Sequence, residues 1–171
     1  MNRVLIAGVG NIFLGDDGFG VQVSGRLACQ VWSTDVRVMD FGIRGVHLAY
    51  ELIAGYDLAI IVDTVSRGAA PGTIYVIEPD LEGVSCGSVS DSHDMVLDNV
   101  FAMVRTLGGS MPPRVLIVGC EPADFGEKIG LSEPVSRAIP NAIRAVLEIV
   151  GGRVASVSVS SAGEMGTHKE A

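Results

Sequence analysis

The sequence has few cysteines and no long hydrophobic run. Its three cysteines, Cys29, Cys86 and Cys120, are odd in number and form no CxxC pair. We therefore expect reduced thiols in core or loop positions and no disulfide framework. The apolar opening, residues 1–10, is too short to cross a membrane and lacks a signal-peptide cleavage pattern. These absences favour a cytoplasmic protein with no membrane partner.

Basic residues are also scarce. The chain holds 12 Lys and Arg against 20 Asp and Glu, which gives a net charge of −8. Because a nucleic-acid backbone is bound through clustered Lys and Arg, nucleic acid is not an expected partner. The sequence also lacks the HExxH and GxSxG motifs and a cysteine nucleophile motif. A hydrolase with this sequence would have to work through a metal or through paired acids.

The length and the glycine content indicate one α/β domain. The chain has 171 residues, of which 48% are hydrophobic and 22 are glycine, and this composition suits strands joined to helices by tight turns. We expect one domain over residues 1–150, with no repeat and no linker. Ser, Gly, Ala and charged residues dominate the rest, so a disordered tail is expected over residues 151–171.

Apolar periodicity predicts the secondary structure. Continuous β-branched runs predict strands at residues 4–9, 36–41, 58–62, 73–77 and 114–119. Helices are expected between them, with buried stripes that run to Val31 and to Leu107. Pro140 lies inside the last helix and is expected to kink or split it. We expect strands 58–62 and 73–77 to form a hairpin or its near equivalent. The fold class expected is a three-layer α/β fold, with a twisted, mostly parallel sheet of about five strands and helices on both faces.

Acidic residues and one histidine follow the predicted strands. Asp16 and Asp17 come after the first strand, Asp63 ends the third, and His93 follows a polar loop. Since the carboxyl ends of parallel strands meet at one edge of a sheet, these groups are expected to meet there. Two carboxylates and an imidazole form an oxygen and nitrogen metal site with vacant positions.

Each of these residues also has a structural interpretation. Asp is a preferred helix cap, so one of Asp16 and Asp17 is expected to cap the following helix while the other faces the strand edge. Asp63 ends a very apolar strand, where its charge needs compensation by a partner or a cation. His93 can be a surface residue at a helix start. Asp40 ends the second strand and either supports the site from a distance or caps the turn that follows.

A dinucleotide site is an alternative that the same region suggests. Gly8 and Gly10 supply the GxG of a Rossmann fingerprint, but Phe13 occupies the position of the third glycine. Asp16 and Asp17 would place negative charge where a pyrophosphate has to bind. Nucleotide binding is therefore disfavoured.

Several segments in a fixed order carry a family resemblance. They are GVGNIFLGDDGFG, the strand that ends at Asp63, the lone His93 after a loop, VGCEP at residues 118–122 and IGLSEPV at residues 129–135. In this combination the chain resembles the hydrogenase maturation endopeptidases over residues 3–150. The resemblance implies a phosphorylase/hydrolase-like fold. It also implies a cytoplasmic enzyme that removes a C-terminal extension from the nickel-loaded precursor of a [NiFe] hydrogenase large subunit. A monomer is sufficient for that task.

The resemblance also assigns roles to the site residues. It implies that Asp17, Asp63 and His93 bind the nickel that the precursor carries, and cadmium or zinc can substitute there. Nickel then either activates the scissile carbonyl or a water, with Asp40 or Asp16 taking the proton, or it only orients the substrate. The catalytic candidates are thus Asp17, Asp63, Asp40 and Asp16. An alternative function is a nickel-dependent docking or chaperone module that does not cleave.

One segment departs from the family pattern. Where the family commonly has an Asp followed by a Gly-Thr type loop, this chain reads DFGIRG over residues 40–45. The threonine is missing and a cation, Arg44, is added. Arg44 either contacts an acidic group of the substrate or marks a subgroup of the family.

Overall fold

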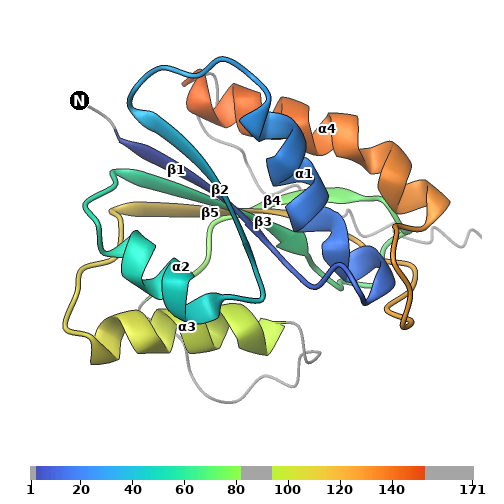
Figure 1. Cartoon of the computed structure of the whole chain (residues 1–171), viewed down its shortest axis with the longest axis horizontal. Helices are drawn as coiled ribbons and strands as arrows, with labels where there is room; N and C mark the ends of the chain where they lie inside the picture. The colour runs from blue at the N-terminus through green and yellow to red at the C-terminus, as the bar shows by residue number, and fades with distance from the viewer. Residues whose placement is uncertain (1–2, 82–93, 153–171) are drawn as a thin grey trace, which may run out of the picture.

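The computed structural model describes residues 3–81 and 94–152, and they form an α/β fold (Figure 1). The elements follow one another in the order β1 (Val4–Val9), η1 (Gly15–Gly18, a 3-10 helix), α1 (Phe19–Ala28), β2 (Val36–Gly42), α2 (Gly45–Leu52), β3 (Leu58–Thr64), β4 (Ile74–Ile77), α3 (Asp94–Thr106), β5 (Arg114–Cys120) and α4 (Glu133–Val150). The five predicted strands are all present, each with bounds within two residues of the prediction.

The five strands form one mixed sheet in the order β2-β1-β3-β5-β4. The pairs β1 with β2, β1 with β3, and β3 with β5 are parallel, and β4 is antiparallel to β5. Helices α1 and α4 cover one face, and α2 and α3 cover the other (Figure 1). This arrangement confirms the expected three-layer fold with a mostly parallel sheet.

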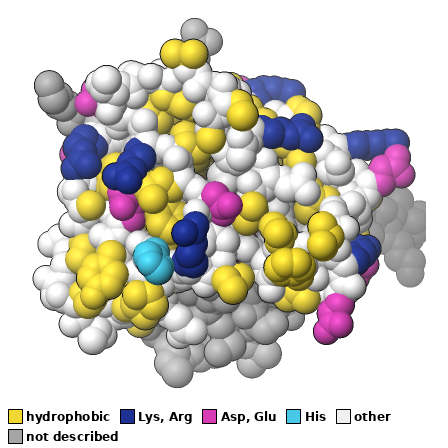
Figure 2. Space-filling model, in the orientation of Figure 1, with side chains coloured by type: hydrophobic (Ala, Val, Ile, Leu, Met, Phe, Trp, Pro, Cys, Tyr) yellow, Lys and Arg dark blue, Asp and Glu magenta, His cyan; other side chains and the backbone are white. Residues whose placement is uncertain are grey.

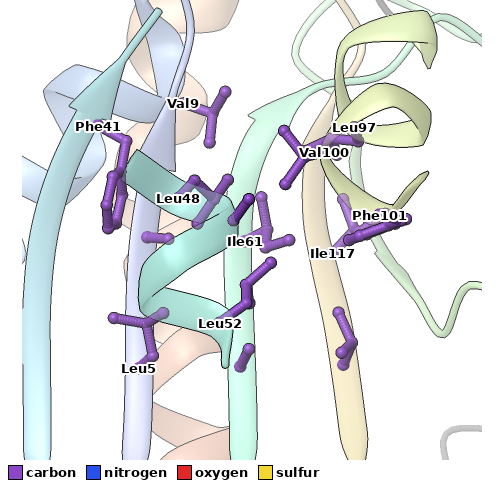
Figure 3. Close-up of a cluster of buried hydrophobic side chains, with 14 of the residues drawn as sticks. Leu5, Val9, Phe41, Leu48, Leu52, Ile61, Leu97, Val100, Phe101 and Ile117 are labelled. Carbon is purple, nitrogen blue, oxygen red and sulfur yellow. The ribbon is translucent and has the colours of Figure 1, made fainter. Parts of the chain in front are cut away.

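Alternation along the central strands divides the core into two hydrophobic clusters. In β1, Leu5 and Ala7 pack in the cluster under α2 and α3, whereas Val4 and Ile6 pack in the cluster under α1 and α4. Figure 3 shows the first of these clusters, in which side chains of both helices meet those of the strands. β1 and β3 are buried on both faces, which is why their sequences are continuous apolar runs and do not alternate with polar residues.

The predicted hairpin of strands 58–62 and 73–77 is wrong. β5 lies between β3 and β4 in the sheet, so the two segments are not neighbours. Strand β5 is buried at all but its first residue, while β4 is only partly buried along its length. A fully apolar strand is more stable in the interior of the sheet, and the half-buried one takes the edge.

Three details of the predicted helices also differ. Val31 is fully exposed because α1 ends at Ala28. Near this end of the helix, the indole Nε1 of Trp32 donates a hydrogen bond to the carbonyl of Leu27. Leu107 lies just beyond the end of α3 and is exposed. Of the kink or split expected at Pro140, the split is wrong, because α4 is continuous from Glu133 to Val150 and Pro140 lies on its exposed side. Among the described residues, no helix is long and apolar enough to cross a bilayer.

One glycine brings α1 unusually close to the sheet. A Cβ atom at Gly20 would lie 2.1 Å from the carbonyl oxygen of Val62 and 2.3 Å from that of Val9. No other residue type fits without moving the backbone. The start of α1, and with it the turn that precedes it, is therefore held against the carboxyl ends of β1 and β3.

Candidate functional site

The structure brings Asp17 and Asp63 to the same edge of the sheet. Asp63 is the penultimate residue of β3, and Asp17 lies in η1, between β1 and α1. Both are buried. Thr64 connects them, since its backbone N–H donates to Oδ1 of Asp63 at 2.7 Å and its hydroxyl donates a long bond to Oδ1 of Asp17 at 3.5 Å. The two carboxylates therefore lie at the same edge of the sheet, on either side of Thr64.

A glycine fixes the position of Asp17. Gly10 has φ of +134°, a conformation that L side chains rarely adopt, and a Cβ atom there would lie 1.8 Å from the carbonyl oxygen of Asp17. The next residue, Asn11, donates its backbone N–H to Oδ2 of Asp17 at 2.8 Å. The tight turn after β1 therefore determines where the Asp17 carboxylate lies.

Asp16 is fully buried and bonded to the segment between β5 and α4. Its Oδ1 accepts the backbone N–H of Ser132 at 2.6 Å. Its Oδ2 accepts the N–H of Ala123 at 2.8 Å, the N–H of Asp124 at 3.0 Å and the hydroxyl of Ser132 at 2.9 Å. Since Ser132 is the N-cap of α4, the carboxylate also lies at the positive end of that helix dipole.

The expectation that Asp16 or Asp17 caps the following helix is wrong. Neither η1 nor α1 has a side-chain cap, and the N-cap residue of α1 is Gly18. The physical reason is competition for the carboxylates. Asp16 accepts hydrogen bonds from a distant segment, and Asp17 accepts one from the turn before it.

Asp40 caps the turn that follows β2. Its Oδ1 accepts the backbone N–H of Gly42 at 2.8 Å, and its side chain is exposed. In the sheet register Asp40 lies opposite Gly8, and Gly8 lies opposite Val62, the residue before Asp63. Asp40 and Asp63 are thus about two strand spacings apart, roughly 10 Å. Of the two structural roles expected for Asp40, the turn cap is present.

His93 lies outside the described residues, as does most of the polar loop that precedes it, together with Cys86 and residues 153–171. In the described part of the chain, no group of three His, Cys, Asp or Glu side chains forms a metal-binding cluster. The described site therefore consists of two buried carboxylates, a donor set that suits a divalent cation.

Glu121 is a buried residue that the sequence patterns did not single out, although it lies in the VGCEP segment. Its carboxylate accepts the backbone N–H groups of Arg67 and Gly68 at 2.8 and 3.1 Å and the hydroxyl of Tyr75 at 2.6 Å. Burial raises its pKa, but these hydrogen bonds outweigh burial and hold the pKa below the ordinary 4.5. Glu121 thus anchors the segment that follows Asp63 and β3.

The buried thiol beside this anchor is not a nucleophile at neutral pH. Burial, followed by the negative charges of Asp16 and Glu121, raises the pKa of Cys120 to about 12. Because the thiolate is the reactive form, the structure agrees with the absence of a cysteine nucleophile motif.

A pocket of 320 Å³ lies beside the site, between the turn after β1 and the turn after β2. Its lining includes Gly10, Phe13, Asp40, Ile43 and Arg44. The guanidinium of Arg44 is held by main-chain carbonyls, since Nε donates to Phe41 at 3.1 Å and Nη2 donates to Asp40. In the described ranges no carboxylate forms an ion pair with Arg44.

Comparisons with known proteins point to one family. The sequence profile of a family described as hydrogenase maturation protease matches residues 21–149. The hydrogenase 2 maturation protease of Escherichia coli (strain K12) is 31% identical over 147 residues, which cover 85% of this chain and 88% of that protein. The hydrogenase expression/formation protein HupD of Rhizobium leguminosarum bv. viciae is 31% identical over 151 residues, which cover 86% of this chain and 74% of that protein.

Solved structures agree with the sequence matches. The hydrogenase maturating endopeptidase HybD from E. coli superposes with a TM-score of 0.75 at 30% identity, over 89% of this chain and 94% of that one. The [NiFe] hydrogenase maturation protease HycI from Thermococcus kodakarensis KOD1 superposes with a TM-score of 0.67 at 27% identity, over 88% and 93% of the two chains.

Proposed function

The chain belongs to the hydrogenase maturation protease family, and from this premise we propose a site and a mechanism for it. It is a hydrolase, an endopeptidase that processes the large-subunit precursor of a [NiFe] hydrogenase. We expect processing to release a C-terminal extension from the nickel-loaded precursor. The reaction is expected in the cytoplasm, on a monomeric enzyme, as the family resemblance implies.

We propose that Asp17, Asp63 and His93 complete the coordination of the nickel that the precursor delivers. The observation that supports this is the burial of two carboxylates at the same sheet edge, joined through Thr64. A divalent cation at this edge would be attracted by both carboxylates and would offset their negative charge. Carboxylate and imidazole are ligands that nickel accepts readily, and zinc or cadmium can replace it in the same donor set.

Asp40 and Asp16 are the two candidates for the group that accepts a proton during cleavage. Bound nickel supplies a positive charge that polarises a carbonyl or acidifies a water. We propose Asp40 as the group that accepts the proton, because it is exposed in the pocket and its second oxygen accepts no hydrogen bond from the described residues. Asp16 is less suited to this role, since four hydrogen bonds engage both of its oxygens.

The test is incubation of the purified protein with its large-subunit precursor, with and without nickel, followed by the mass of the large subunit. Loss of a C-terminal peptide only with nickel, abolished in Asp17→Ala and in His93→Ala, is the expected result. Asp98→Ala, which removes an exposed carboxylate of α3, is the control and should cleave normally.

Two other outcomes would contradict parts of the proposal. An unchanged mass with a stable, nickel-dependent complex would make the protein a docking module. If the Asp40→Asn variant cleaves the nickel-loaded precursor at the wild-type rate, Asp40 is not the proton acceptor.

A further inference from the structure

The pocket beside the site has an exposed apolar rim. Ile12 and Phe13, in the turn after β1, are 41% and 60% exposed, and Ile43, in the turn after β2, is 75% exposed. All three line the same 320 Å³ pocket. Figure 2 shows exposed hydrophobic side chains interspersed with basic and acidic ones on the face that it draws. Single exposed apolar residues are normal, but three around one pocket are typical of an interaction site.

Arg44 gives this pocket a fixed positive charge. Two main-chain carbonyls orient the guanidinium, and neutral carbonyls do not cancel its charge. A guanidinium has five N–H donors in a planar fork, of which these bonds use two. Arg44 therefore retains donors for a carboxylate, with the geometry for a two-point contact.

The pocket also borders the candidate site through Gly10. Gly10 lines the pocket, and its backbone lies directly against the carbonyl of Asp17. The Gly10 N–H donates to the carbonyl of Gly42 at 3.0 Å, so the two turns that form the walls are joined. The pocket therefore borders the turn that positions Asp17.

We propose that this pocket binds an extended segment of the precursor next to the scissile bond, with an apolar side chain between Phe13 and Ile43 and an acidic side chain on Arg44. The inference rests on the proposed function and names the peptide chemistry that the site selects. A second copy of this chain is the less favourable occupant, because each copy carries a net charge of −8.

The test compares the kinetics with which the Arg44→Glu variant and the wild-type enzyme cleave nickel-loaded precursor. We expect KM to rise about tenfold or more with kcat little changed, because a contact that forms equally in the ground and transition states is lost. Arg26→Glu is the matched control, since Arg26 is another exposed arginine, in the last turn of α1, and should leave KM unchanged. Ile43→Ser should raise KM in the same direction.

Charge exchange makes the test specific. Each acidic residue of the precursor around the scissile bond is changed to lysine in turn, and Arg44→Glu should cleave one of these substrates better than the wild-type enzyme does. If no exchange restores cleavage, or if Arg44→Glu behaves like Arg26→Glu, the proposal is wrong. A fall in kcat alone, or a change of oligomeric mass in Arg44→Glu, would also overturn it.

A binding measurement separates this proposal from the proposed function. A fluorescent synthetic peptide that spans the scissile bond is titrated with the protein without nickel. Weaker binding to Arg44→Glu than to Arg26→Glu supports the pocket even if the wild-type protein cleaves no precursor. Equal binding to the two variants contradicts it, whatever the cleavage assay shows.

Discussion

Replacing Asp16 by alanine removes one acceptor group that four donors share. Three of these donors are backbone N–H groups, those of Ala123, Asp124 and Ser132, and the fourth is the Ser132 hydroxyl. A hydrogen bond to a charged group contributes about 1.5–3 kcal/mol, so the simple sum is about 6–12 kcal/mol. Ala123 and Asp124 are exposed residues, and water can replace part of what their N–H groups lose.

The expected loss for Asp16→Ala is therefore about 3–5 kcal/mol in the free energy of unfolding, the range for breaking a buried charged network. Asp16→Asn keeps one acceptor oxygen for the three donors at Oδ2, but it places an NH₂ group against the Ser132 N–H. We expect it to lose about 1–3 kcal/mol. Since domains are stable by only about 5–15 kcal/mol, Asp16→Ala should fold but with a small margin.

Urea denaturation measures both variants, with the midpoint and the slope fitted together. Glu133→Ala is the control at the same end of α4, because it removes an exposed ion pair with Arg137 and should cost at most about 0.5 kcal/mol. If Asp16→Ala lies within about 1 kcal/mol of the wild type, the carboxylate does not hold the two segments together. The free energy of unfolding should also increase from Asp16→Ala to Asp16→Asn to the wild type, and any other order would contradict the reasoning.

Further predictions concern the turn, the pH dependence and the thiols. Gly10→Ala places a Cβ 1.8 Å from the Asp17 carbonyl and should cost about 2 kcal/mol or more and abolish cleavage. Gly25→Ala, which meets nothing within 4 Å inside α1, should instead stabilise the protein by about 0.5–1 kcal/mol in the same denaturation assay. The hydrogen bonds that lower the pKa of Glu121 stabilise the fold above pH 4.5, and this contribution is lost as the pH falls through the lowered pKa. Glu121→Gln should therefore flatten the acid side of a stability–pH profile. Burial and the bond to Glu121 raise the pKa of Tyr75 to about 12. The contribution of Tyr75 to the free energy of unfolding is therefore complete below pH 10 and is lost between pH 10 and 12. Tyr75→Phe should remove this loss of stability at alkaline pH. With Cys86 replaced by serine, iodoacetamide at pH 7.5 should label exposed Cys29 and leave buried Cys120, whose pKa is about 12, unmodified. Labelling of both thiols at similar rates would contradict the assigned burial.

The strands and the two site carboxylates were predictable because their signals are local. A run such as LAIIV before Asp63 identifies a buried strand, and the end of a parallel strand places the acid at the sheet edge. The partners of Asp16 were not predictable, because they lie 107–116 residues away and no local pattern encodes them. Within the sequence window Asp16 is indistinguishable from an ordinary helix cap.

The order of the strands in the sheet could not be predicted from the sequence either. Apolar content identified segments 58–62 and 73–77 as strands, but the hairpin interpretation assumed that neighbours in sequence are neighbours in the sheet. The more apolar β5 displaces β4 to the edge, and this choice depends on the burial of the whole sheet. Glu121 was missed for a related reason, since Arg67 is brought to it only when β3 pairs with β5, and Tyr75 only when β4 pairs with β5.

The bonds of Asp16 also have a consequence for synthesis. The turn that carries Asp17 is fixed at Ser132, 116 residues further along the chain. During translation, a nascent chain that ends before Ala123 contains both carboxylates of the site but none of the four donors to Asp16, so the turn is not yet held. The enzyme therefore completes this set of bonds only when the chain has been made through Ser132, and shortened fragments that end before Ala123 should be inert toward the precursor.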